Sequence, residues 1–164
     1  MNKVLLLIGS NLGSRELILD RAKTMINEGV GKITCQSSIY ETEPWGFDSK
    51  RQFLNQVILI ESDLKPHEVL SRSLKIEKSL GRQRTNGDGY HSRSIDIDIL
   101  MFDNLTLRDD NLEIPHPRLH ERNFTLVPMA EIAGDWIHPG LDKSISQLAE
   151  NSIDTGVVKR YRPE

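Results

Sequence analysis

The sequence lacks the features that mark secreted, membrane-spanning or disulfide-stapled proteins. Its 164 residues contain one cysteine, Cys35, so no disulfide can form within the chain, and we expect a reducing compartment. The apolar run Val4–Ile8 is too short for the apolar region of a signal peptide or for a membrane span. We therefore expect a cytoplasmic protein with no membrane partner, in which Cys35 is a small buried residue on a strand.

A strong charge of either sign is also absent. Lys and Arg number 21 and Asp and Glu number 24, which gives a net charge of −3. This balance argues against general nucleic-acid binding, which relies on a basic surface. Hydrophobic residues make up 37% and charged residues 27% of the chain, as in folded globular proteins. With no linker, repeat or low-complexity segment, we expect a single domain over residues 1–164.

Several common catalytic motifs are missing. The segment GSNLGSR (9–15) is glycine-rich but lacks the Lys-Ser/Thr end of a P-loop. His116 and His120 have helical i, i+4 spacing, but Pro115 and Pro117 oppose a helix there and HExxH is absent, so zinc is not expected. There is no Cys/His cluster and no GxSxG turn.

Hydrophobic periodicity predicts a βαββαβ order over residues 3–102. Helices are expected from Ser14 to Gly29 and from Pro66 to Gly81, and strands at 4–8, 32–40, 53–60 and 93–100. This is the ferredoxin-like order of an α+β protein, with an antiparallel sheet and both helices on one face. We expect residues 103–164 to form a C-terminal extension of loops, with short helices beginning near Pro128 and Ser144.

The strand RSIDIDIL (93–100) carries two acidic residues on one face. Its isoleucines should face the helices, which places Asp96 and Asp98 on the opposite face. Two unit charges about 6 Å apart repel by roughly 3 kcal/mol at an effective dielectric near 20. Divalent cations would offset this repulsion, and Mg²⁺ prefers carboxylate oxygens together with phosphates. The alternative is a solvated strand face with two scattered acids.

Arginines near this strand favour phosphate chemistry. Arginine recognises phosphate through paired hydrogen bonds, and the candidates are Arg82, Arg84, Arg93, Arg118 and Arg122. The connections 41–52 and 81–93 exceed the usual length, and loops that close over a reaction exclude water. Together these features indicate phosphoryl chemistry on a nucleotide. For any one arginine a surface role is the simpler interpretation, except for Arg93, which lies three residues before Asp96.

At this point the sequence resembles a known family. The motifs are IGSNLG near residue 8, YETEPWG (40–46), FLNQV (53–57), IEKSLGRQR (76–84), Arg93-x-x-Asp-x-Asp98 and IPHPRLHERNFTLVPMAEIA (114–133). In this order they resemble 6-hydroxymethyl-7,8-dihydropterin pyrophosphokinase, an enzyme of folate biosynthesis. The resemblance implies that ATP donates its two terminal phosphates, as a unit, to the hydroxymethyl group of the pterin, which leaves AMP.

The resemblance also implies roles for residues on the phosphate side of the site. Asp96 and Asp98 would bind two Mg²⁺ ions, and Arg82 and Arg93 would stabilise charge on the phosphates as catalytic residues. Other residues match positions on the nucleotide side, with Ile99 contributing a backbone contact to adenine; these are Glu77, Arg84, Ile99, His116 and Arg122.

For the pterin, the resemblance implies a site made of rings and one amide. Phe53 and Phe124 match aromatic residues that sandwich the flat bicycle. Asn55 carries both a donor and an acceptor for the amide edge of the pterin, and Thr42 and Trp45 match contacts of the first long loop. The chain departs from the family pattern at Glu43, His91, Asn111 and Glu113.

Two alternatives come from other classes of protein. A ferredoxin-like RNA-binding module also carries aromatic residues on its sheet, but the RNP strand motif is absent and paired acids would repel RNA. A regulatory domain that binds a small molecule without chemistry has no need of two metal ions. We therefore expect an enzyme, acting as a monomer on ATP and 6-hydroxymethyl-7,8-dihydropterin.

Overall fold

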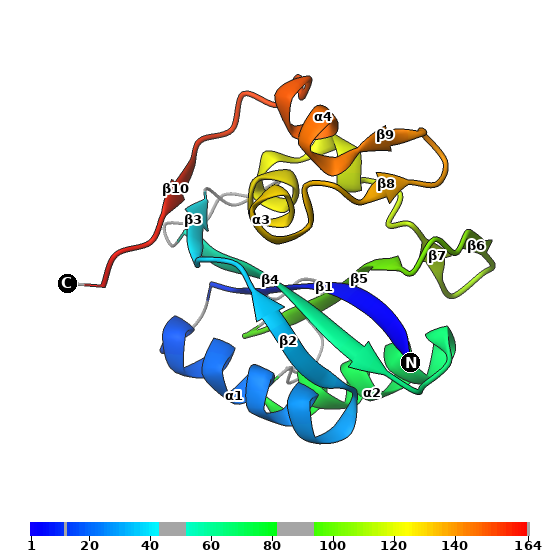
Figure 1. Ribbon diagram of the computed structural model, residues 1–164. Helices are drawn as coiled ribbons and strands as arrows, with labels where there is room; N and C mark the ends of the chain where they lie inside the picture. The colour runs from blue at the N-terminus through cyan, green and yellow to red at the C-terminus, as the bar shows by residue number, and fades with distance from the viewer. Residues whose placement is uncertain (12, 43–51, 82–93, 164) are drawn as a thin grey trace.

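The computed structural model describes residues 1–11, 13–42, 52–81 and 94–163. Its middle layer is a six-stranded antiparallel sheet (Figure 1). The strand order is β10-β3-β4-β1-β5, with β2 also pairing β4. The bounds are β1 Asn2–Ser10, β2 Lys32–Gln36, β3 Tyr40–Thr42, β4 Phe53–Ser62, β5 Asp96–Phe102 and β10 Val158–Arg160.

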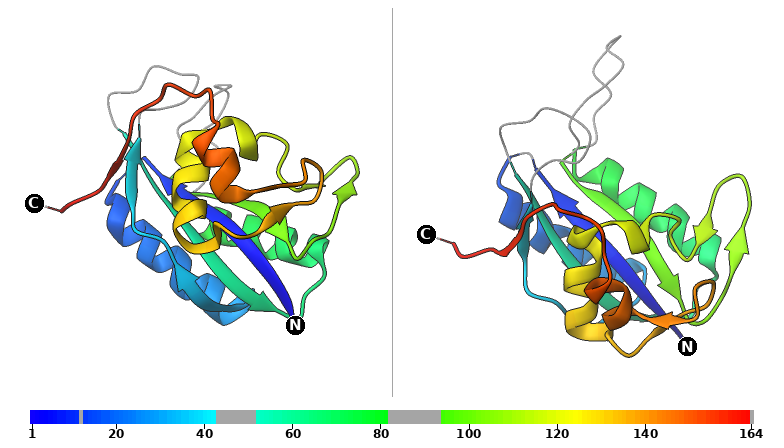
Figure 2. Two further views of the ribbon diagram at one scale, coloured as in Figure 1. Left: turned by 45° about the horizontal axis from the view of Figure 1, so that its top comes forward. Right: turned by 90° about the horizontal axis from the view of Figure 1, so that it is seen from above.

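Helices cover both faces of this sheet (Figure 1, Figure 2). Helices α1 (Arg15–Gly29) and α2 (Pro66–Ser79) lie on the first face, and α3 (Asn123–Ala133) and α4 (Ile145–Glu150) lie on the second. The remaining elements are short: β6 Leu107–Arg108 pairs with β7 Glu113–Ile114, β8 Ile137–His138 pairs with β9 Lys143–Ser144, and η1 spans Leu119–Glu121.

The central strand β1 is buried on both sides, which explains its unbroken apolar run. Val4, Leu6 and Ile8 pack into a core with α1 and α2, whereas Leu5 and Leu7 pack into a second core with α3 and α4. Toward the C-terminal end of β1, Gly9 follows Leu7 on the second face and supplies no apolar side chain. One end of the second face is therefore less apolar than the rest.

The predicted antiparallel sheet is confirmed, and α1 and α2 lie together on one face of it. The helices are not confined to that face, because α3 and α4 cover the other. Helix α3 begins at Asn123 and contains Pro128 in its interior. Its sequence is mostly apolar, with Glu131 as its one charged residue, so it shows no clear apolar stripe. Pro128 therefore gave a wrong start for the helix.

The predicted strand 32–40 is two strands, β2 and β3, and β10 was not predicted. The prediction that Cys35 is buried is wrong, since Cys35 is exposed. Within the described residues β2 pairs only with β4, and its register shifts between Ile33 and Cys35. This shift interrupts the alternation of buried and exposed positions. No helix in the described part of the chain has the length and apolarity needed to cross a membrane.

Candidate active site

Three neighbouring strands bring polar residues together at one end of the second face. Gly9 on β1 lies directly opposite Asn55 on β4 and also opposite Asp96 on β5. Residues opposite one another in antiparallel strands point to the same face. Leu7 shares a face with Gly9 and packs against the α3 and α4 core. Asn55 and Asp96 therefore flank Gly9 on the face that α3 and α4 partly cover.

The orientation predicted for the acidic pair on β5 is confirmed. Ile97 and Ile99 are each 5% exposed and belong to the core formed with α1 and α2. Asp96 and Asp98 consequently lie on the opposite face, and both are partly exposed to solvent. Asp98 is opposite Leu7 on β1, so the pair extends from the polar end of this face toward its apolar part.

Asp96 and Asp98 fit a magnesium site that a phosphate ligand would complete. Within residues 1–11, 13–42, 52–81 and 94–163, no three or more His, Cys, Asp or Glu residues cluster as a metal site. Magnesium in nucleotide-dependent enzymes is usually held by one or two carboxylates, with phosphates and waters filling its other positions. Two neighbouring carboxylates on a half-exposed strand face suit this mode of binding.

The Asn55 side chain is fixed within the sheet. Its Nδ2 donates a hydrogen bond to the Thr42 hydroxyl at 2.9 Å, and Asn55 is only 4% exposed. A Cβ atom built on Gly9 would lie 2.6 Å from Asn55 Oδ1, so the amide occupies space that only glycine leaves open. Asn55 retains one N–H and its carbonyl oxygen for a ligand.

Gly9 is the residue that sequence reasoning missed. Its position at the end of a buried strand suggested a strand terminus, whereas it is a pairing position of β1 with β4 and β5 on either side. A glycine inside a strand often marks the close approach of another group. That signal was present, but the sequence did not identify the approaching group as the Asn55 amide.

Glu77 stabilises the strand that carries the acidic pair. It lies on α2, is 3% exposed, and its Oε2 accepts a hydrogen bond from the Ile97 backbone N–H at 2.7 Å. Ile97 stands between Asp96 and Asp98, so this bond holds the backbone of β5 at the site. Ile99, predicted to contact adenine through its backbone, has its side chain in the core.

His116 lies beside β5 and is held as a neutral ring. Its backbone N–H donates to the Leu100 carbonyl at 2.9 Å, just after the cis peptide bond Ile114–Pro115. Burial, followed by the charges of Arg122 and Arg118, lowers the pKa of His116 to about 4. Since Nδ1 accepts the Arg118 backbone N–H at 3.1 Å, the ring proton resides on Nε2.

Arg122 lies at the start of α3 and interacts electrostatically with Asp98 of the acidic strand β5. Its guanidinium lies 5.4 Å from the centre of the Phe124 ring, a cation–π distance. Burial is the main cause that lowers the pKa of Arg122, and the charge of Arg118 adds to it, while Asp98 and Glu121 act in the opposite direction. Arg122 nevertheless keeps its positive charge at neutral pH, within the electrostatic reach of Asp98.

The predicted aromatic residues come from two elements in contact. Phe53 lies on β4 opposite Thr42 of β3, and Phe124 lies in the first turn of α3 and packs against the second core. Helix α3 packs on both β4 and β3. Both rings are half-buried, so they border the same end of the sheet as Asn55.

Other predicted residues fall elsewhere. Asn111 and Glu113 belong to the β6–β7 hairpin, where Asn111 is exposed and Glu113 pairs with Arg108 at 3.2 Å. A further group lies outside the described residues: Glu43, Trp45, Arg82, Arg84, His91 and Arg93. The structure thus brings together Asp96, Asp98 and Asn55, with Arg122 and Phe124 close by.

Comparison with known proteins identifies the family of the chain. The model of the family 7,8-dihydro-6-hydroxymethylpterin-pyrophosphokinase (HPPK) matches residues 5–134. The chain belongs to this family. HPPK proteins are pyrophosphokinases, so the protein is an enzyme of the diphosphotransferase class, and the two non-catalytic alternatives are set aside.

Several curated relatives carry the name 2-amino-4-hydroxy-6-hydroxymethyldihydropteridine pyrophosphokinase. The HPPK of Porphyromonas gingivalis is 44% identical over 138 residues, which are 83% of this chain and 93% of the relative. The HPPK of Bacillus subtilis is 41% identical over 126 residues, which are 76% of this chain and 74% of the relative.

A solved structure shares the fold at low sequence identity. The wild-type HPPK-DHPS of Plasmodium falciparum, in a crystal structure with pteroate, aligns with a TM-score of 0.75 and 16% identity. The alignment covers 91% of this chain but only 44% of that one. The protein thus spans less than half the length of this two-part relative, and the likeness supports the HPPK fold alone.

Proposed function

We propose that this HPPK protein transfers the terminal pyrophosphate of ATP to the hydroxymethyl group of 6-hydroxymethyl-7,8-dihydropterin, in a Mg²⁺-dependent reaction that yields the pterin diphosphate and AMP. The step would belong to folate biosynthesis, since one similar protein is named folic acid synthesis protein fol1 of Pneumocystis carinii. Family membership and the acidic pair on β5 support the proposal.

We also propose how the chain is organised for this role. It would act as one pyrophosphokinase domain over residues 1–164, with a ferredoxin-like core and a C-terminal extension, as a cytoplasmic monomer. The order of β3, β4, β1 and β5, with α1 and α2 on one face, supports the ferredoxin-like description. The net charge of −3 favours small-molecule partners over nucleic acid.

The observation that carries the proposal is the row Asn55, Gly9, Asp96 across three strands. Neighbouring strands are about 4.8 Å apart, so the backbones at Asn55 on β4 and Asp96 on β5 are about 10 Å apart. A flat pterin held by its amide edge at Asn55 could extend its hydroxymethyl arm over Gly9 toward Asp96. The site that binds the pterin and the site that binds the phosphates would then lie next to each other on one face of the sheet.

On the phosphate side, Asp96 and Asp98 would hold two Mg²⁺ ions. When bound, the ions would neutralise charge on the triphosphate and orient it for in-line displacement. A new bond forms between the hydroxymethyl oxygen and the β-phosphorus, the bond from that phosphorus to the bridging α,β-oxygen breaks, and AMP leaves. The hydroxyl proton goes to Asp96 or to water.

The remaining residues would bind and orient the two substrates. On the nucleotide side, Arg122 supplies positive charge and neutral His116 supplies an Nε2–H donor, and we propose roles there for Glu77, Arg84 and Ile99. Arg82 and Arg93 would stabilise charge on the transferred group. On the pterin side, Asn55 would form hydrogen bonds with the amide edge, and Phe53 and Phe124 would stack on the ring. Thr42 and Trp45 would complete the contacts.

An assay with ATP, Mg²⁺ and the reduced pterin tests the proposal. Wild-type protein should form AMP and the pterin diphosphate, whereas Asp96→Asn and Asp98→Asn should each lose about 10²-fold or more in kcat, because each removes a charge that holds the metals. Asp63→Asn is the matched control, since Asp63 is exposed and follows the end of β4 that lies farthest from Asn55. Normal turnover in both site variants would contradict the proposal.

A further inference from the structure

The C-terminal part of the chain completes the sheet next to the pterin side of the site. Strand β10 pairs antiparallel with β3, and Val158 lies opposite Thr42. In Figure 1 this last strand runs along the outer edge of β3. We call residues 157–162 the C-terminal strap. It lies beyond residues 5–134, which the family model matches.

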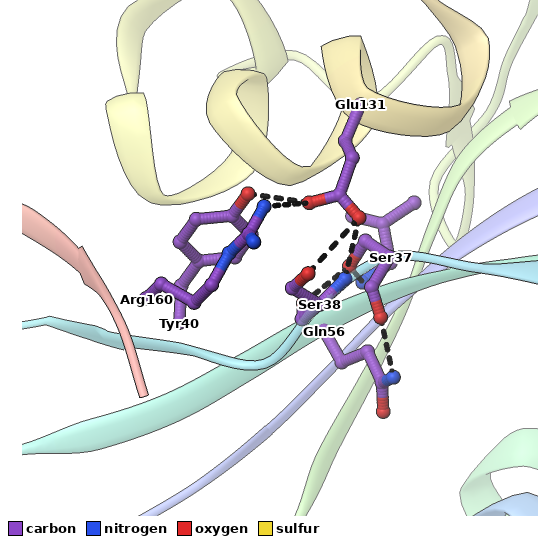
Figure 3. Close-up of polar contacts among 7 residues, drawn as sticks. Ser37, Ser38, Tyr40, Gln56, Glu131 and Arg160 are labelled. Atoms are coloured by element: carbon purple, nitrogen blue, oxygen red, sulfur yellow. Dashed lines mark hydrogen bonds and ion pairs between the residues drawn. The ribbon is translucent and has the colours of Figure 1, made fainter. Parts of the chain in front are cut away.

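The strap is tied to α3 on the second face of the sheet. Figure 3 shows the Glu131 side chain reaching from α3 toward β3 and β10. Its Oε1 accepts the Tyr40 hydroxyl at 2.5 Å and lies 3.6 Å from the Arg160 guanidinium. Its Oε2 accepts both the backbone N–H and the hydroxyl of Ser38, at 2.7 and 3.2 Å.

This carboxylate is held in its charged form. Burial acts to raise the pKa of Glu131, but hydrogen bonds from Tyr40 and Ser38 and the charge of Arg160 outweigh burial, so its pKa is lowered from the ordinary value. Charge-assisted hydrogen bonds are stronger than neutral ones. Glu131 therefore fixes the segment that leads into β3 and the strand beside it.

On the first face, the strap is tied to α1. The Tyr161 backbone N–H donates to the Ile39 carbonyl at 2.8 Å, and its hydroxyl donates to Glu16 at 2.5 Å. The Arg15 guanidinium lies 5.7 Å from the Tyr161 ring. The same guanidinium donates to Glu41 of β3 at 2.9 Å. Consecutive strap residues thus connect β3 to a helix on each face.

Strand β3 is short, and its position determines the orientation of the Asn55 amide. Only Tyr40–Thr42 form the strand, and it pairs with β4 so that Tyr40 lies opposite Asn55. The Thr42 hydroxyl accepts the bond that orients Asn55. Without the strap, a three-residue strand would have one neighbour and a free edge, which is a weak arrangement.

We propose that the C-terminal strap is a part of the pterin site, acting through β3, and that Arg160 and Glu131 are positioning residues for the Thr42–Asn55 pair. This inference rests on the proposed function. The strap lies at the opposite end of the strand order from β5, so its effect should fall on the pterin and not on the nucleotide.

The test compares the affinities for the two substrates. Full-length protein and a chain ending at Gly156 are titrated separately with 6-hydroxymethyl-7,8-dihydropterin and with a non-hydrolysable ATP analogue. Loss of the strap should raise the pterin Kd and KM about tenfold, the equivalent of about one net hydrogen bond, and leave the Kd of the ATP analogue within about twofold.

Point variants keep the inference testable if the shortened chain does not fold. Arg160→Ala should raise the pterin Kd by about twofold to fivefold, as expected for a partly exposed ion pair. Arg160→Lys should restore part of the pterin affinity by keeping a positive charge near Glu131. Lys159→Ala is the matched control, because Lys159 is exposed on the same strand. Thermal unfolding of each variant separates a loss of fold from a loss of pterin affinity.

The outcomes distinguish this inference from the proposed function. If wild-type protein forms no pterin diphosphate, the proposed function fails. If wild-type protein is active but Arg160→Ala and the shortened chain bind the pterin normally, the strap has no part in the site. Equal losses of affinity for both substrates would also overturn the inference, since they indicate a general structural effect.

Discussion

Gly9→Ala is the substitution that most sharply probes how the site is built. The new methyl group would lie 2.6 Å from Asn55 Oδ1, about 1 Å closer than ordinary van der Waals contact. The amide cannot withdraw freely, because Asn55 is 4% exposed and bonded to Thr42. We therefore expect the amide to rotate away from its position and lose that hydrogen bond.

The magnitude follows from these contacts. A lost hydrogen bond costs about 1 kcal/mol, and an off-rotamer side chain costs about 1 kcal/mol more. We expect the free energy of unfolding to fall by about 1–3 kcal/mol, as for an overpacked core. Since the displaced amide would no longer face the pterin edge, kcat/KM for the pterin should fall by roughly 10- to 100-fold.

The assay measures pterin affinity, turnover and urea unfolding for Gly9→Ala beside Gly29→Ala. Gly29 is the matched control, because a Cβ there meets nothing within 4 Å. If Gly9 acts through Asn55, adding Gly9→Ala to Asn55→Ala should cost little further pterin affinity. Full pterin affinity in a folded Gly9→Ala protein, or additive losses in the double variant, would refute the reasoning.

Three further predictions concern other parts of the molecule. Glu77→Ala should lower the free energy of unfolding by about 2–3 kcal/mol in urea titrations, because it leaves the buried Ile97 N–H unpaired; an unchanged midpoint would contradict this. His116 has a folded-state pKa of about 4, below its ordinary 6.5, so the unfolded chain binds more protons between these values. Stability should fall as the pH drops from 6.5 toward 4, by about 1–2 kcal/mol after allowance for screening, and His116→Asn should lose less over that range. Cys35 is exposed, so a thiol reagent should label the native protein rapidly, and slow labelling that requires denaturant would count against the structure.

The elements that could be predicted from the sequence are those whose signals are local. The run Val4–Ile8 identified a buried strand because β1 is covered on both faces. The predicted helix end at Gly29 agrees with the end of α1. The alternation in the first half of β5 gave the correct face for Asp96 and Asp98, since buried Ile97 and Ile99 alternate there with the two half-exposed acids.

The elements that could not be predicted depend on partners distant in the sequence. Strand β10 is the sequence Val-Lys-Arg, which has no strand pattern, and it forms because β3 offers a free edge. Helix α3 lacks a polar face because it lies between the sheet and α4. The role of Gly9 depends on a side chain from β4, and that of Glu131 on contacts with β3 and β10, none of which is visible in local sequence.

The measurement that tests the central claim most directly is ³¹P NMR of the complete reaction with ATP, Mg²⁺ and 6-hydroxymethyl-7,8-dihydropterin. Transfer of pyrophosphate as a unit predicts the signals of AMP and of a pterin diphosphate, appearing in equal amounts, and their loss in Asp96→Asn. The appearance of ADP with a pterin monophosphate, or of free phosphate without a phosphorylated pterin, would contradict the account.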